Sequence, residues 1–366
     1  MTTAEEIAHF RLRNQRLVGE RFDSPAEVVR WLGAVQSQDF PAAKWALGLR
    51  LNDSNEASID QAFNNGEILR THVLRPTWHF VMPQDIRWLL KLTAPRVITS
   101  STGQYRRHGL DGPTFKRSNR TLERELEGGK QLTRTALVTA LKAANIQTDN
   151  LGYMLLMMRA ELDGLICSGP RRGKQFTYML LDERAPALER FNRDEALRSL
   201  AERYFTSHGP ATPHDFSWWS GLTVGDARHA IEMLGSKTER IDVDGRTYFS
   251  GAASVSTVAE HHSVLILPIY DEAIIAYQDR SAYLRRLAES KTLLPENIVF
   301  NHTILLDGQI VGIWRRSVSA RAVTVEPTYF IQLKRTERLE IEDAIERHAA
   351  FLGLPLTVPA VESNDE

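Results

Sequence analysis

The sequence predicts an α+β protein in which three tandem winged helix-turn-helix modules form a concave body, followed by a β-rich C-terminal portion. The first observation is an order of helices and then a hairpin that occurs three times along the chain. The second is a series of short apolar runs after residue 262, which are typical of strands. The modules share this order and no detectable sequence identity, so we interpret them as an architectural repeat.

The first module is expected at residues 1–82. Apolar side chains at helical spacing predict a helix over 3–19. The stretch 24–27, Ser-Pro-Ala-Glu, predicts the start of a second helix, because serine and glutamate can cap each other's backbone and proline fits the first turn. Ser58 opens a third helical pattern, and 68–81 indicates a pair of strands.

A connector that is helical at first and then basic is expected over 83–112, and the second module over 113–185. In this module, helical patterns extend over 114–127, 133–143 and 151–162. Two strand patterns follow, over 165–168 and 175–180. The turn between the two strands carries Arg171, Arg172 and Lys174 with no acidic residue among them.

The third module is expected over 190–250 and has the strongest helix-turn-helix signal. Thr212 and Thr223 each stand at the start of a helical pattern, with a short turn at Gly221 between them. A hairpin bent at Asp244-Gly245 completes the module.

The β-rich portion is expected over 262–355. Asp307-Gly308 predicts a hairpin turn between two of its strands, and a helix over 337–352 closes the chain.

Composition excludes several classes of protein. The 45 Lys and Arg against 46 Asp and Glu give a formal net charge of −1, which excludes a histone-like binder but allows one basic face. The single cysteine excludes an internal disulfide and fits the cytoplasm. No run approaches the roughly 20 apolar residues of a membrane span. The histidines lack a convincing set of ligands, so we predict neither a metal nor another cofactor.

Gln36 and Gln38 are the leading candidates for a chemical centre. Pro41 disfavours helical geometry at the residue before it, so the preceding helix should end within or just before the pair. On extended backbone, positions two apart point the same way, and both amides can then face one substrate. Glutamine does not titrate, so the pair cannot serve as general acid and base. It can orient a water molecule, which suits a leaving group that is already cationic, such as an alkylated purine.

Asp39 follows the two glutamines directly. Its carboxylate can support an oxocarbenium ion, or it can simply cap a turn of the chain. The bland alternative for the whole stretch is a polar helix end followed by a loop without chemistry.

Other polar and aromatic residues are candidates for contacts with nucleic acid. Arg75, Trp78 and His79 offer a phosphate contact, a stacking face and a polar contact, although the same pattern fits a hairpin with Trp78 in the core. The basic tip at 171–174 suits phosphates or a minor groove if it is a wing, but such tips are also ordinary solubilising surface. The remaining candidates lie at strand ends: Tyr270, Arg280, Arg315 and Arg316.

Five stretches resemble a bacterial winged-helix family that contains the AlkZ and YcaQ-like DNA glycosylases. They follow the family's order over nearly the whole chain: Ala34–Arg50, His72–Phe80, Asp215–Leu222, Leu267–Asp271 with Asp279-Arg280, and Leu306–Arg315.

The resemblance implies three tandem winged helices that form a concave DNA-binding scaffold. It also implies excision of bulky N7-alkylated purines, including crosslink-type adducts. The family's Gln-x-Gln motif falls on Gln36 and Gln38, which position the hydrolytic water. The YcaQ-like branch has an acid at the second position, so this chain looks closer to the AlkZ branch. Ser37 departs from the aliphatic residue expected between the glutamines.

The leading hypothesis is a monofunctional DNA glycosylase that acts as a monomer on double-stranded DNA carrying alkylated purines, in the cytoplasm at the nucleoid. Apart from Lys44, no lysine accompanies the motif, so no Schiff-base step is expected. The alternative is a non-catalytic winged-helix protein that binds DNA or regulates transcription. That protein would prefer a particular sequence in undamaged DNA, as a dimer across a palindrome.

Overall fold

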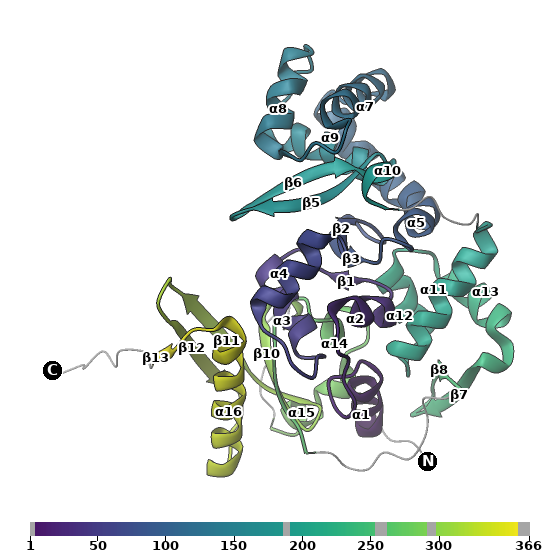
Figure 1. The fold of residues 1–366 in the computed structure, drawn as a ribbon. Coiled ribbons are helices and arrows are strands. Elements are labelled where there is room, and N and C mark those ends of the chain that lie inside the picture. Colours follow the sequence, from purple (N-terminus) through teal and green to yellow (C-terminus); the bar gives the residue numbers. More distant parts are fainter. Residues whose placement is uncertain (1–3, 186–190, 253–261, 291–297, 358–366) are drawn as a thin grey trace.

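The computed structural model describes residues 4–185, 191–252, 262–290 and 298–357. Helices and strands are mixed along the chain, which confirms the predicted α+β class (Figure 1). The expected module boundaries at residues 1 and 190 lie outside the described residues. Among the described helices, none is long and apolar enough to cross a membrane.

Residues 25–81 form a first unit of helices and sheet, preceded by α1 (Ala4–Asn14). Its elements follow in the order α2 (Pro25–Leu32), β1 (Val35–Gln36), α3 (Phe40–Gly48), α4 (Glu56–Asn65), β2 (Leu69–His72) and β3 (Trp78–Val81). The three strands lie in the order β1-β3-β2 and are antiparallel. The reciprocal cap between Ser24 and Glu27 starts α2 as predicted, and α2 ends before Gln36.

The helix α3 differs from the sequence prediction, which places no helix between α2 and residue 58. Pro41 was expected to lie beyond a helix end, but it lies in the first turn of α3. Backbone N–H groups in a first turn have no partner within the helix, so the lack of an N–H in proline removes no helical hydrogen bond. Asp39 caps α3, because its Oδ1 accepts a hydrogen bond from the Ala42 N–H at 2.9 Å. The next helix starts at Glu56 rather than at Ser58.

The second unit repeats the same order of elements. Two connecting helices, α5 (Ile86–Ser100) and α6 (Thr102–Arg107), lead into it, so the basic connector is helical. The unit consists of α7 (Gly112–Leu126), β4 (Leu132–Thr133), α8 (Arg134–Ala143), α9 (Asn150–Leu162), β5 (Ile166–Arg172) and β6 (Gln175–Leu180), followed by the short α10 (Leu181–Arg184). Its strand order, β4-β6-β5, matches that of the first unit.

The third unit has the helices and the hairpin, and an isolated bridge takes the place of the short strand. Its elements are α11 (Arg193–Ser207), α12 (Pro213–Ser220), α13 (Val224–Leu234), β7 (Thr238–Val243) and β8 (Arg246–Gly251). The bridge joins Ala211 to Phe249. Thr212 and Thr223 cap α12 and α13, which confirms the predicted helix starts.

The C-terminal portion is built on a five-stranded sheet in the order β13-β12-β11-β10-β9. Its elements are β9 (Val264–Leu267), α14 (Glu272–Ile275), α15 (Arg285–Glu289), β10 (His302–Leu306), β11 (Gln309–Val318), β12 (Val323–Tyr329), α16 (Arg335–Leu352) and β13 (Leu356–Thr357). Asp307 and Gly308, with φ of 51° and 71°, form the predicted turn between β10 and β11.

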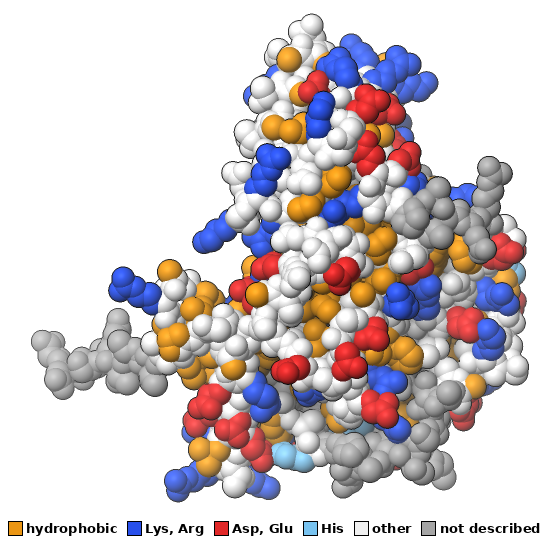
Figure 2. All heavy atoms as spheres, viewed as in Figure 1, with side chains coloured by type: hydrophobic (Ala, Val, Ile, Leu, Met, Phe, Trp, Pro, Cys, Tyr) orange, Lys and Arg blue, Asp and Glu red, His pale blue; other side chains and the backbone are white. Residues whose placement is uncertain are grey.

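Buried apolar side chains of the described residues gather in two cores. The first and third units share one core with the C-terminal portion, whereas the second unit has its own core together with parts of α5 and α6. The second unit stands as a separate lobe at the top of Figure 1. In Figure 2 the outline is hollowed between the tip of the β5–β6 hairpin and the β11–β12 arm, and Lys and Arg side chains stand at both tips.

A buried ion pair ties the first unit to the C-terminal portion. Arg50, on the turn after α3, donates from Nη1 and Nη2 to the two carboxylate oxygens of Asp271, each at 2.9 Å. The same guanidinium donates to Gln15 Oε1 at 2.8 Å. Both members of the pair are excluded from water, at 0% exposure. The pair fixes the chain immediately before α14.

We expect Arg50→Met to destabilise the fold strongly, because it leaves the Asp271 carboxylate buried without its partner. Removing one member of a buried pair typically costs about 3–5 kcal/mol. Urea unfolding followed by circular dichroism measures this loss. Glu20→Gln, which removes the exposed partner of Arg16, is the control and should leave the unfolding free energy nearly unchanged. Equal effects of the two variants would contradict the assigned role of the buried pair.

Candidate active site

The motif segment is extended and lies along β3. Gln36 pairs with His79 in the β1–β3 register. The Ser37 N–H donates to the Trp78 carbonyl at 2.7 Å, and Gln38 Oε1 accepts from the Trp78 N–H at 3.3 Å. The backbone of β3 therefore fixes the segment on both sides of Ser37.

Gln36 is buried, and two charged side chains hold it. Its main-chain N–H donates to Glu272 Oε1 at 2.7 Å, and its side-chain Oε1 accepts from Arg75 Nη2 at 2.7 Å. Hydrogen bonds with one ionised partner are shorter and stronger than neutral ones. Backbone and side chain of Gln36 are thus both anchored, and its amide has one preferred orientation.

Glu272 is a fully buried carboxylate that the sequence did not mark as a site residue. Trp219 Nε1 donates to its Oε2 at 3.0 Å, and His208 Nε2 lies 3.6 Å from the same oxygen. Burial by itself raises the pKa of Glu272, but His208 and the Gln36 N–H outweigh it, and the pKa lies below its ordinary value. The carboxylate is therefore ionised at neutral pH. No local pattern identifies it, since its partner in the motif is 236 residues away.

Arg75 and Arg280, both predicted to contact DNA, come together around Trp218. Arg75 Nη1 donates to the Trp218 carbonyl at 3.5 Å, and the Arg280 guanidinium lies 5.6 Å from the centre of the Trp218 ring. The indole is 42% exposed, so it presents an aromatic surface beside Gln36. Burial lowers the pKa of both arginines, because each is largely withdrawn from water.

Gln38 is exposed and lines a cavity of about 430 Å³ between the first and second units. Trp78 and Arg70 belong to the wall on the side of the first unit. The second unit contributes an apolar and aromatic group, with Met154, Met157 and Met158 from α9 and Phe176 and Tyr178 from β6. It also contributes a polar and basic group, which consists of Thr133, Arg134, Thr135, Lys174 and Gln175. The two glutamines therefore have different surroundings, one in a buried polar network and the other at a cavity.

Arg70 connects the motif backbone with the cavity wall. Its Nε and Nη2 donate to the Ser37 carbonyl at 3.1 and 3.0 Å. The guanidinium lies over the rings of Trp78 and Phe176, at 4.4 and 4.6 Å from their centres. Burial lowers the pKa of Arg70 to about 10, so it remains protonated at neutral pH. The sequence did not single it out, because strand alternation cannot distinguish a buried arginine from a solvated one.

His79 and Trp78 have different positions although they are neighbours on β3. His79 is fully buried, and its Nδ1 donates to the Thr77 carbonyl at 3.0 Å. Burial lowers the pKa of His79 to about 3, so its ring is neutral. The ring supports the sheet and does not present the polar contact expected from the sequence. Trp78 is half-buried and packs on His72, with 4.2 Å between ring centres.

The basic tip of the β5–β6 hairpin is less uniform than its sequence indicates. Arg171 is engaged by α4, since its Nη1 lies 3.3 Å from Asp60 Oδ1 and its main-chain N–H donates to Asn64 Oδ1 at 2.8 Å. Arg172 and Lys174 are exposed. Of the three basic residues at the tip, Arg172 and Lys174 therefore present their charge to solvent.

The remaining predicted residues come from the C-terminal portion. Arg315 is exposed on β11, whereas Arg316 is half-buried and donates to His348 Nε2 at 3.2 Å. Burial lowers the pKa of Arg316, and the negative charge of Asp39 acts in the opposite direction. Tyr270 is half-buried in a left-handed backbone conformation, with φ of 64°.

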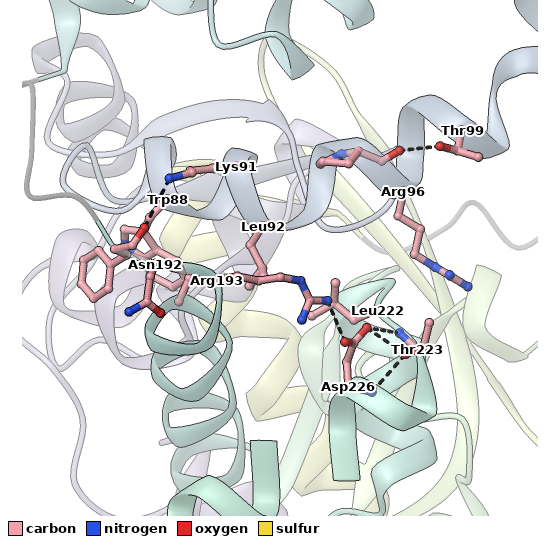
Figure 3. Close-up of a pocket in the computed structure, with 13 residues that line it drawn as sticks. Trp88, Lys91, Leu92, Arg96, Thr99, Asn192, Arg193, Leu222, Thr223 and Asp226 are labelled. Carbon is pink, nitrogen blue, oxygen red and sulfur yellow. Dashed lines mark hydrogen bonds and ion pairs between the residues drawn. The ribbon is translucent and has the colours of Figure 1, made fainter. Parts of the chain in front are cut away.

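A second cavity, of about 580 Å³, lies away from the motif between α5, the start of α11 and the turn between α12 and α13 (Figure 3). Arg193, Asp226 and Lys91 have hydrogen-bond partners within the wall. Arg193 Nη2 donates to Asp226 Oδ1 at 2.7 Å, and Lys91 Nζ donates to the Phe191 carbonyl at 3.4 Å. The predicted site residues do not line this cavity, so the candidate site is the region around Gln36 and Gln38. Among the described residues, no group of three or more His, Cys, Asp or Glu could hold a metal ion.

Comparisons with known proteins agree with the resemblance. A family model described as DNA glycosylase AlkZ-like matches residues 29–351. A curated relative, the interstrand DNA cross-link repair glycosylase of Streptomyces sahachiroi, is 24% identical over 381 aligned positions, covering 95% of each chain. The solved structure of Streptomyces sahachiroi DNA glycosylase AlkZ has a similar fold, with a TM-score of 0.77 at 21% identity, covering 98% of this chain and 99% of that chain. Because the family model spans most of the sequence, the chain belongs to the AlkZ-like DNA glycosylase family.

Proposed function

We propose that this protein is a monofunctional DNA glycosylase that hydrolyses the N-glycosidic bond of N7-alkylated purines with a water molecule positioned by Gln36 and Gln38. The observation that carries the proposal is the extended motif in which Gln36 is fixed by Arg75 and Glu272 while Gln38 lies in a cavity wall. Donors and acceptors that are already oriented lower the barrier without a reorganisation cost.

The amides hold the water rather than activate it as bases. An N7-alkylated purine already carries positive charge, so it can leave without a proton. As it leaves as a neutral base with the electrons of the glycosidic bond, positive charge develops on the sugar. A water held at the anomeric carbon attacks, forms the new C–O bond and releases its excess proton to the solvent. Asp39 uses one carboxylate oxygen to cap α3, and we propose that the same carboxylate gives electrostatic support to the developing cation.

The lysine nearest to the motif in sequence is unsuited to Schiff-base chemistry. Lys44 is buried, and its Nζ lies 2.8 Å from Glu56 Oε1 and 2.9 Å from Asp60 Oδ2. Both contacts would have to break before the amine could attack a sugar carbon to form a Schiff base. This supports hydrolysis that ends at an abasic site.

We propose that the repeated units, at 1–82, 113–185 and 190–250, are winged helices that hold duplex DNA along the hollow face. The repeated element order and the matching strand orders of the first two units support this. The exposed Arg172, Lys174 and Arg315 are suited to phosphates, and the more buried candidates to contacts nearer the lesion: Arg75, Trp78, Arg171, Tyr270, Arg280 and Arg316. One chain carries the whole site, so we propose a monomer. The family match does not favour a non-catalytic regulator.

Gln38→Ala and Gln36→Ala should each lower single-turnover release of 7-methylguanine from duplex DNA by about 10²–10³-fold, the loss typical of removing one positioned polar group from a transition state. Gel analysis after cleavage of abasic sites measures the release. Gln104→Ala, on the exposed surface of α6, is the matched control and should retain wild-type release. Equal release by wild type and both motif variants would remove the glutamines from the mechanism.

The release rate should be flat between about pH 6 and pH 8, because no group in the proposed mechanism titrates there. Glutamine has no pKa, and burial lowers the pKa of His79 to about 3 and shifts that of His208 downwards. The His79 ring therefore stays neutral through this window, and His208 is not part of the proposed mechanism. Single-turnover rates across the window measure the profile. A profile with a midpoint near the ordinary pKa of histidine would show that an imidazole takes part.

The double variant Arg172→Gln/Lys174→Gln should weaken binding of undamaged duplex and reduce the slope of log K against log salt by about 2, since each phosphate contact contributes roughly 0.9. Fluorescence anisotropy at several salt concentrations measures the slope. Lys116→Gln/Arg120→Gln makes the same charge change on the exposed face of α7, away from the hairpin tip, and should leave the slope unchanged. Equal slopes for the two variants would argue against contact at the tip.

A further inference from the structure

We propose that the cavity beside Gln38 receives the substituent carried by the alkylated purine, and that it selects uncharged apolar or aromatic substituents. The inference rests on the proposed function, because the purine must lie at the glutamines for its substituent to reach the cavity. It goes beyond that function by giving the adduct a chemical class and a place in the structure.

The position of the cavity links it to the site of hydrolysis. Gln38 is part of the wall, and so is Trp78, whose N–H donates to Gln38 Oε1. Arg70 lies in the same wall and binds the Ser37 carbonyl. A group attached to a base at Gln38 is therefore adjacent to the cavity without any movement of the motif.

The wall has the chemistry of a site for apolar groups of varied shape. Three methionines of α9 lie on one side, and Phe176 and Tyr178 lie nearby. Methionine is flexible and polarizable, and it adapts to ligands of different outline. Aromatic rings add contact surface with few rotatable bonds. This wall needs no fixed pattern of hydrogen bonds from the substituent.

The charged side chains that line the cavity are basic, and the one carboxylate known behind the wall, that of Glu161, is paired with His72. Arg70, Arg134 and Lys174 line it, and none of the described lining residues is acidic. A cationic substituent would lose its hydration and meet like charge there. The cavity therefore favours neutral substituents over cationic ones.

The size of the cavity favours bulky adducts. Its volume of about 430 Å³ falls within the roughly 300–1,000 Å³ typical of small-molecule sites. A methyl group leaves most of this space unfilled and forgoes the dispersion contacts that a ring would make with the wall. We therefore expect preference for an aryl-substituted purine over a methylated one.

The binding test uses the methionines as reporters and does not depend on catalysis. The chain has seven methionines, of which Met154, Met157 and Met158 line the cavity. In the intact protein labelled with methyl-¹³C methionine, free 7-benzylguanine should shift these three signals, assigned by Met→Leu variants. Free 7-methylguanine and a 7-(aminoalkyl)guanine should shift them much less.

The catalytic test compares duplexes that carry 7-benzylguanine or 7-methylguanine. Met154 is half-buried, so Met154→Trp can fill the cavity without replacing a core residue. We expect this variant to lower the benzyl-to-methyl ratio of kcat/KM by at least about tenfold, the scale on which pocket size discriminates between substrates. Leu151→Trp is the matched control, because Leu151 is exposed on the same helix and does not line the cavity. Its ratio should equal that of wild type.

The outcomes separate this inference from the proposed function. If 7-benzylguanine is released but none of the three methionine signals moves and Met154→Trp keeps the wild-type ratio, the cavity assignment is overturned and the glycosylase stands. If the signals move with the benzyl base and no base is released, the cavity assignment is supported and the glycosylase proposal fails. Shifts of equal size with single-stranded undamaged DNA would assign the cavity to the nucleic-acid strand and overturn the inference.

Discussion

The structure of the site depends on one buried charge, the Glu272 carboxylate behind Gln36. A buried carboxylate is costly unless hydrogen bonds and nearby positive charge offset its lost hydration. The Gln36 N–H and the Trp219 indole supply the hydrogen bonds, and Arg75, which also binds the Gln36 side chain, supplies positive charge. Glu272 belongs to the C-terminal portion, and it binds Trp219 of the third unit and Gln36 of the motif. These contacts fix the three parts of the chain relative to one another.

That arrangement gives the two glutamines unequal freedom. Gln36 belongs to a network in which every change of orientation breaks a hydrogen bond to a charged group. Gln38 is attached to the backbone of Trp78 and otherwise faces the cavity. In the proposed mechanism, Gln36 keeps the hydrolytic water in one place while the region at Gln38 adapts to substrates of different size.

Short sequence patterns predicted helix caps and turns well, but they did not predict contacts between residues that are distant in the sequence. The caps at Ser24 and Thr212 and the turn at Asp307-Gly308 were predictable because each depends on residues a few positions apart. The helix α3 was missed because Pro41 is compatible both with a position beyond a helix end and with a first turn. Glu272 and Arg70 escaped prediction because burial and partners decide their roles, and neither follows from spacing.

The net charge of −1 does not show which arginines are buried and which are exposed. Arg11, Arg50 and Arg70 are buried, where they bind carboxylates, carbonyls and aromatic rings. The charge count therefore says little about the surface, on which exposed arginines and lysines stand at the hairpin tips. Contacts between such charges and phosphates are the same on damaged and undamaged DNA. For such a protein, discrimination between damaged and undamaged DNA must come from contacts that only the lesion makes, and the cavity beside Gln38 offers such contacts at the motif itself.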